Sequence, residues 1–136
     1  MIKLPKNIYN DMVSHAQSGL PLESCGYLAG NENIVQHFYP MTNIDQSPEH
    51  FSFDPKEQFS VVKDARSKGL NLVAVYHSHP ESPARLSEED IRLFNDPHMI
   101  YIIVSLMSGQ TDVKAYQVIK PDEHTVHIKR VKLDIF

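Results

Sequence analysis

The chain has 136 residues, of which 41% are hydrophobic and 22% charged, and its formal net charge is -4. This length suits one domain with one core, spanning residues 1–136, and the hydrophobic content excludes wholesale disorder. The mildly acidic balance does not suggest the strongly basic surface with which proteins bind nucleic acids or anionic membranes.

A single cysteine, Cys25, excludes an internal disulfide framework and any cysteine-rich zinc site. It precedes the apolar segment "GYLAG", so we expect a small buried residue there and not a reactive thiol. No apolar run is long enough to span a bilayer, and the segment "MIKLPKNIYNDMV" lacks the apolar region of a signal peptide. We therefore expect a cytoplasmic protein.

The first expected element is a helix over residues 5–18, which begins at a proline and ends before a glycine. Ile8, Met12 and either His15 or Ala16 recur at helical spacing, so they should form its buried face.

Three strands are expected next. Residues 24–30 and 33–41 form a pair joined by the turn "NEN", and residues 50–55 form a short strand of alternating apolar and polar side chains. This last strand offers an edge to which an extended substrate peptide could add.

A second helix, over residues 55–68, begins at a proline and ends before a glycine. Phe59, Val62 and either Ala65 or Arg66 share one face and are expected to point inward.

The second half of the chain consists mainly of strands. Residues 70–79 are nearly all apolar up to the last few positions, as in a central strand covered on both faces. A short helix at 87–96 and a second buried strand at 99–107 follow. The more alternating segments 111–119 and 124–135 are typical of outer strands. Together these elements predict a three-layer α/β (α+β) domain, in which helices pack around a mixed sheet.

The strongest chemical signal is "YHSHPESPARLSEED" (76–90), which opens with two histidines. Side chains alternate along a strand, so His77 and His79 point the same way, with Cα atoms roughly 6–7 Å apart. Two imidazoles at this spacing can converge on one zinc ion at bond lengths of about 2.0–2.1 Å. The pattern alone also fits two ordinary loop histidines, and it leaves both interpretations open.

Ser87 and Asp90 have the spacing of a helix capping box, which is a common structural feature. If the loop 80–86 folds back, Asp90 also supplies a third metal ligand, although one Ser87 hydroxyl cannot fully serve both a cap and a metal site. Two imidazoles and one carboxylate with an open fourth position are the composition of a catalytic zinc site.

A hydrolytic site also requires a base, and the candidate is Glu23 in "LPLESCGYLAG", at the junction of the first helix and the first strand. Glutamates are usually solvated, so the local sequence by itself favours an exposed side chain.

These residues resemble the JAMM (MPN+, JAB1/MPN/Mov34-type) zinc metalloproteases. The chain contains their spaced pattern H-x-H-x(7)-S-x(2)-D, and "PLESCGYLAG" and "FSFDPKEQF" are similar to further segments of that family, over about residues 21–107. The resemblance implies a cytidine-deaminase-like mixed sheet flanked by helices.

The resemblance also implies roles for five residues. One Zn²⁺ per chain would be held by His77, His79 and Asp90. Glu23 is implied as the general base for the attacking water, and Ser87 as a hydrogen-bond donor to the tetrahedral oxyanion.

Family members cleave isopeptide bonds of ubiquitin, or process ubiquitin-like and sulfur-carrier proteins that end in Gly-Gly, in some cases releasing an attached amino acid. Only residues 91–98 separate Asp90 from the next expected strand, which leaves no room for a large insertion and favours the short, stand-alone prokaryotic type. The resemblance thus implies a ubiquitin-like or sulfur-carrier protein as substrate. Two alternatives stay open: a non-catalytic scaffold of the same fold, and a zinc amidohydrolase for small molecules.

Overall fold

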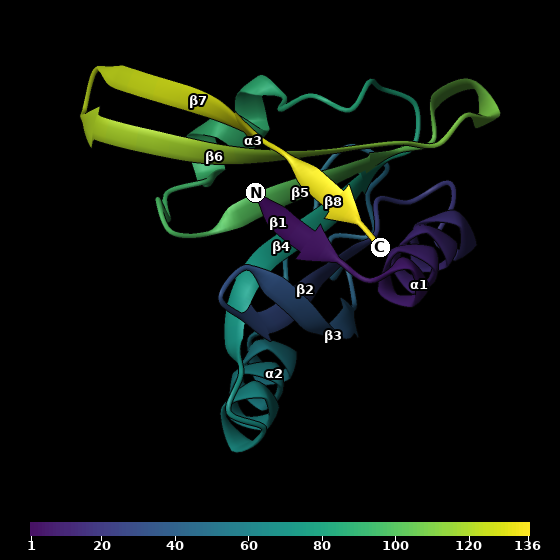
Figure 1. Ribbon diagram of the computed structural model, residues 1–136. Helices are drawn as coiled ribbons and strands as arrows, with labels where there is room; N and C mark the ends of the chain where they lie inside the picture. Colours follow the sequence, from purple (N-terminus) through teal and green to yellow (C-terminus); the bar gives the residue numbers. More distant parts are fainter.

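The computed structural model describes residues 1–136, which form one eight-stranded sheet and three α-helices (Figure 1). The strands are β1 (Ile2–Leu4), β2 (Cys25–Asn31), β3 (Ile34–Met41), β4 (Asn71–His79), β5 (Ile100–Ser105), β6 (Asp112–Asp122), β7 (Thr125–Val131) and β8 (Leu133–Ile135). The helices are α1 (Lys6–Ser18), α2 (Pro55–Ser67) and α3 (Glu88–Leu93), with one 3₁₀ turn, η1 (Met107–Gly109). No helix of the structure is long and apolar enough to cross a membrane.

The sheet is mixed, with the strand order β7-β6-β5-β4-β2-β3-β1-β8. Its central strand, β4, pairs in parallel with β5 and antiparallel with β2. The predicted mixed sheet flanked by helices is therefore confirmed.

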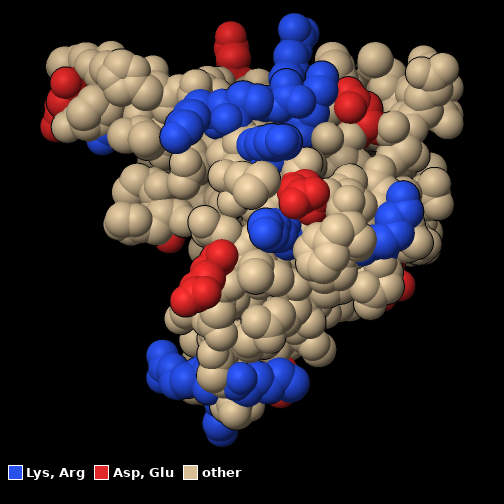
Figure 2. All heavy atoms as spheres, viewed as in Figure 1, with Lys and Arg blue, Asp and Glu red and all other residues tan.

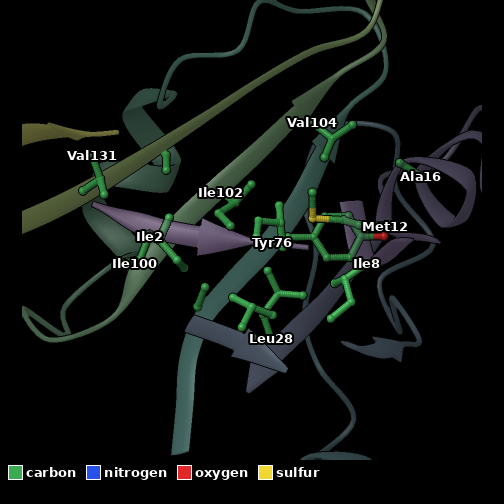
Figure 3. Close-up of a cluster of buried hydrophobic side chains, with 14 of the residues drawn as sticks. Ile2, Ile8, Met12, Ala16, Leu28, Tyr76, Ile100, Ile102, Val104 and Val131 are labelled. Carbon is green, nitrogen blue, oxygen red and sulfur yellow. The ribbon is translucent and has the colours of Figure 1, made fainter. Parts of the chain in front are cut away.

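The two faces of β4 lie in different hydrophobic cores. Ala74 and Tyr76 pack in a cluster with the buried face of α1 (Figure 3), whereas Val75 packs in a second cluster with residues of α2. Because strand side chains alternate, the odd-numbered residues at the end of β4 point to the α2 side of the sheet. This side carries the two histidines.

The strand expected at 50–55 is wrong, because the segment makes only one isolated antiparallel bridge, between Asn43 and Phe53. The Ser52 amide, which a longer ladder would use, donates to the Asn43 side chain at 3.3 Å. Asp54 then caps α2 by accepting from the backbone amide of Lys56. Side-chain hydrogen bonds thus replace the sheet pairing that the alternation suggested.

Of the inward face expected for the second helix, Ala65 is confirmed, whereas Phe59 and Val62 are wrong. Phe59 is 71% exposed and Val62 39% exposed, whereas Val61 and Ala65 are buried. The neighbouring stripe faces the sheet, where the Gln58 amide donates to the Tyr27 hydroxyl at 2.8 Å.

Two elements in the second half of the chain differ from expectation. The segment expected as one strand at 124–135 is divided into β7 and β8, and β8 pairs in parallel with β1, a strand too short to give a periodic pattern. The helix expected at 87–96 already ends at Leu93, because Phe94 has an extended backbone and is buried in the second cluster.

Charge is distributed unevenly over the surface. Figure 2 shows lysines and arginines gathered over the strands β6 to β8 and around the end of α2, with acidic side chains between them. Lys129, Arg130 and Lys132 line one shallow hollow of this basic region. The net charge of -4 therefore coexists with a locally basic surface.

Candidate metal centre

The end of β4 brings His77 and His79 together on one face. Both are almost completely buried, at 0% and 5% exposure, and their Nε2 atoms lie 3.1 Å apart. Tyr76, which precedes His77 in β4, is buried in the first core cluster on the opposite face of the sheet. The strand alternation thus produces the converging imidazole pair.

The loop 80–86 folds back over the end of the sheet because three of its carbonyl groups accept hydrogen bonds. The Ser105 hydroxyl donates to the Ser82 carbonyl at 2.7 Å, and the Tyr116 hydroxyl donates to the Ala84 carbonyl at 2.6 Å. The third donor is Nδ1 of His79, which lies 2.9 Å from the Pro83 carbonyl. These bonds carry the start of α3 to the two histidines.

Asp90 occupies the third corner of the cluster. One of its oxygens, Oδ2, lies 3.2 Å from Nε2 of His77 and 3.2 Å from Nε2 of His79. The same oxygen accepts the backbone amide of Ser87 at 3.0 Å, and the Ser87 hydroxyl oxygen accepts the backbone amide of Asp90 at 3.0 Å. The capping box is therefore present, and it aims Asp90 at the imidazole pair.

The Ser87 hydroxyl can both cap the helix and act in the site. The cap uses its oxygen as an acceptor, while a hydroxyl also has one proton to donate. Ser87 is exposed, so this proton can reach a bound substrate. The cap therefore leaves the hydroxyl proton of Ser87 free for a second hydrogen-bond partner.

The triad of His77, His79 and Asp90 has the geometry and the donor set of a divalent metal site. Its three facing atoms are 3.1–3.2 Å apart, and ligands at about 2.0–2.1 Å in a tetrahedron would be separated by about 3.3 Å. Because a carbonyl only accepts, His79 must carry its proton on Nδ1, which leaves the Nε2 lone pair directed at the cluster.

The charge states of the triad also fit a cation. Burial lowers the pKa of His77, so its imidazole stays neutral. Burial opposes ionisation of Asp90, but the contacts of its Oδ2 with the His77 imidazole and the Ser87 backbone amide outweigh it and hold the pKa of Asp90 far below its usual range. Two neutral imidazoles and one carboxylate are ligands that suit Zn²⁺.

Glu23 lies beside this triad and not in solvent. In the antiparallel register of β2 and β4, Cys25 lies opposite His77. Two hydrogen bonds between Ser24 and Ser78 continue this pairing by one residue. Glu23, the next residue back along the chain, is therefore level with His79. Its side chain is only 4% exposed, and Oε1 has no hydrogen-bond partner. The exposed side chain that the local sequence favours is therefore wrong.

The acidity of Glu23 reflects this position. Burial raises its pKa to about 9, and the negative charges of Asp90 and Glu89 add to the shift. All three causes penalise an ionised carboxylate, whereas a divalent cation at the triad would favour one. The buried, unpartnered oxygen and the acidic surroundings thus point to a positive charge at this site.

An aromatic cleft of about 480 Å³ adjoins the triad, and Asp90 is part of its wall. Phe51 stacks on the His77 ring at 4.9 Å, and Phe94 meets that ring edge-on at 5.6 Å. The cleft continues between Phe53 and Tyr101. The contacts of Phe51 and Phe94 with His77 were not predicted, because they join segments far apart in the sequence and no local pattern marks them.

Cys25 takes no part in the cluster of ligands. It is completely buried in the second core, as expected, and burial raises the pKa of its thiol to about 12. A thiolate nucleophile at this position is therefore disfavoured.

Comparisons with known proteins agree with this geometry. Residues 5–119 match the model of a family described as "Prokaryotic homologs of the JAB domain". The chain is 32% identical over 116 residues to the CysO-cysteine peptidase of Mycobacterium tuberculosis, which covers 83% of this chain and 80% of that relative. It is 32% identical over 111 residues to the desampylase of Haloferax volcanii, covering 76% of this chain and 80% of that relative.

A solved structure is similar over the whole chain. The solution structure of protein DSY2949 from Desulfitobacterium hafniense is 39% identical, with a TM-score of 0.87, and the match covers 100% of this chain and 93% of that one. The resemblance inferred from the spaced motif is therefore confirmed, and the chain belongs to the family of prokaryotic homologues of the JAB domain.

Proposed function

We propose that this protein is a zinc-dependent peptidase or isopeptidase. Its substrate would be the amide bond that follows the C-terminal Gly-Gly of a ubiquitin-like or sulfur-carrier protein. The observation that carries the proposal is the buried acid Glu23, level with His79 beside the triad of His77, His79 and Asp90. A triad alone would bind a metal, whereas an adjacent buried carboxyl group adds a group that can move a proton.

The names of the relatives support a protein substrate of this class, because one is a CysO-cysteine peptidase and the other a desampylase. A Gly-Gly tail also suits the space near the triad. Phe51 and Phe94 pack against His77 and narrow the space beside it, and glycines, which lack a Cβ, need the least room there. The single, buried Cys25 is compatible with the cytoplasm, where we place the protein.

The residues of the site divide the reaction between them. His77, His79 and Asp90 would hold Zn²⁺, which when bound polarises the scissile carbonyl and makes water more acidic. Glu23 takes a proton from the attacking water onto its carboxylate and then delivers it to the leaving amine. The Ser87 hydroxyl donates a hydrogen bond to the oxygen that becomes negative as the carbonyl carbon turns tetrahedral.

The test is to incubate the zinc-loaded protein with sulfur-carrier or ubiquitin-like proteins that carry one amino acid after Gly-Gly, and to follow their mass. We expect loss of that amino acid with the wild-type protein. Glu23→Gln should retain about one zinc per chain and lose nearly all activity, because glutamine cannot accept the proton.

Two outcomes would contradict the proposal. Less than half a zinc per chain after metal-replete purification would favour the non-catalytic scaffold. Turnover of small amides without cleavage of any protein conjugate would favour the amidohydrolase.

A further inference from the structure

We propose that Asn43 is a positioning residue for Glu23. The inference rests on the proposed function, because it concerns how the proposed base is held. Asn43 lies in the segment 42–54 between β3 and α2, well away in sequence from the metal-binding motif.

The Asn43 side chain has all of its hydrogen-bonding capacity in use. Its amide nitrogen donates to the backbone carbonyl of Glu23 at 2.9 Å and to that of His50 at 3.0 Å. Its oxygen accepts the backbone amides of Asp45 at 3.1 Å and Ser52 at 3.3 Å. One primary amide therefore joins Glu23 to both arms of the segment 43–52.

The backbone amide of Glu23 is held by the same segment, because it donates to the Ser47 carbonyl at 2.9 Å. Hydrogen bonding to β4 begins only at the next residue. The Ser24 amide donates to the Ser78 hydroxyl at 2.8 Å, and the Ser24 carbonyl accepts the Ser78 amide at 2.9 Å. Ser24 is thus fixed by β4, and Glu23 by the segment around Asn43.

The backbone anchor of Glu23 matters because hydrogen bonds to the carboxyl oxygens do not fix the position of this group. Oε1 is buried without a partner, so the placement of the carboxyl group follows from where its backbone is held. A shift of about 1 Å in a reacting group can lower turnover on the order of 10²-fold. The backbone anchor of Glu23 should therefore act on catalysis and not only on stability.

The same segment carries Phe51, which stacks on His77. Asn43 bonds to both neighbours of Phe51, through the His50 carbonyl and the Ser52 amide. One side chain thus sets two distances at once: from Glu23 to the triad, and from the aromatic wall of the cleft to His77.

The test compares Asn43→Asp and Asn43→Ala with the wild-type zinc enzyme. Aspartate keeps the two hydrogen bonds accepted from the amides of Asp45 and Ser52, but it loses both donated bonds and adds a negative charge. Alanine loses all four bonds and adds no charge, so an effect common to both variants does not come from the charge. A matched control is Asn31→Asp, because Asn31 likewise donates from its amide to a backbone carbonyl, that of Gly69 at 3.0 Å, but at the opposite end of β2.

We expect both Asn43 variants to lower kcat by roughly 10- to 100-fold, with zinc content unchanged, and the Asn31 variant to keep the wild-type kcat. Amide hydrogen exchange should accelerate at Glu23 in the Asn43 variants, and this readout does not depend on catalysis. Unchanged exchange at Glu23, a wild-type kcat, or an equal fall in kcat in the control would overturn the inference. If the wild-type protein cleaves no conjugate, the proposed function fails, while the exchange measurement still decides whether Asn43 anchors Glu23.

Discussion

Removing the acid at Glu23 should stabilise the metal-free protein at neutral and alkaline pH. The buried carboxyl group has a pKa of about 9, against an ordinary value near 4.5. Between these values the folded state binds a proton that the unfolded state has lost. Stability is therefore fully present below about pH 4.5 and decreases as the pH rises towards 9. Glutamine has a similar shape and no ionisable group, so Glu23→Gln abolishes this loss.

The magnitude follows from the same two pKa values. Each pH unit above the unfolded-state pKa lowers the unfolding free energy by about 1.4 kcal/mol until the folded-state pKa is reached. From about pH 4.5 to pH 7 this gives about 3 kcal/mol of lost unfolding free energy as an upper limit. Movement of the side chain towards water would reduce this figure, so we expect Glu23→Gln to be more stable by about 1–3 kcal/mol at pH 7. Zinc should remove most of the difference, because its charge favours the carboxylate of the wild-type protein.

The assay is urea unfolding of the metal-stripped wild type and Glu23→Gln at pH 5, 7 and 8.5, with and without added zinc. Both proteins contain His77, whose lowered pKa makes stability fall as the pH drops below about 6.5, so that contribution cancels when the proteins are compared at one pH. The reasoning is refuted if the two metal-free proteins keep the same difference in unfolding free energy from pH 5 to pH 8.5.

Three further substitutions test other parts of the site. Asp90→Asn keeps an oxygen for the helix cap but loses the negative charge, so bound zinc should fall below half an ion per chain by elemental analysis; full occupancy would contradict the ligand assignment. Ser87→Ala should lower kcat about 10²–10³-fold with zinc retained, and should cost about 1 kcal/mol in urea unfolding through loss of the cap; an unchanged kcat would remove Ser87 from the mechanism. Tyr116→Phe loses the hydrogen bond to the Ala84 carbonyl. It should lower the unfolding free energy by about 1 kcal/mol and weaken zinc binding in a chelator competition. Zinc affinity equal to that of the wild type would show that this bond does not hold the loop 80–86 in place.

The clustering of His77, His79 and Asp90 could be predicted because it follows from local rules. The two-residue period of a strand places His77 and His79 on one face, and the capping box places Asp90 at the start of α3. The one non-local requirement was that the loop between them fold back. That depends on Ser105 and Tyr116, which lie on other strands and have no signature in the motif.

The position of Glu23 could not be predicted from its neighbours in the sequence. Its burial results from its place next to Ser24, which β4 holds, and from the backbone bonds of Glu23 to Asn43 and Ser47. The Asn43 side chain also explains why the segment 50–55 is not a strand, since its oxygen takes up the Ser52 amide that the ladder would need. The incorrect strand and the incorrectly exposed glutamate therefore have one physical origin.

The spacing of the motif itself has a structural explanation. In H-x-H the interval of two is the repeat of a strand, and in S-x(2)-D the interval of three is the distance from an N-cap residue to the third residue of a helix. Asp90 uses one oxygen, Oδ2, both to accept the Ser87 amide and to face His77 and His79. A glutamate at position 90 would place its oxygens one methylene further from the helix and could not make both contacts without moving α3. One aspartate oxygen thus serves the helix cap and faces both imidazoles, which ties the third corner of the cluster to the start of α3.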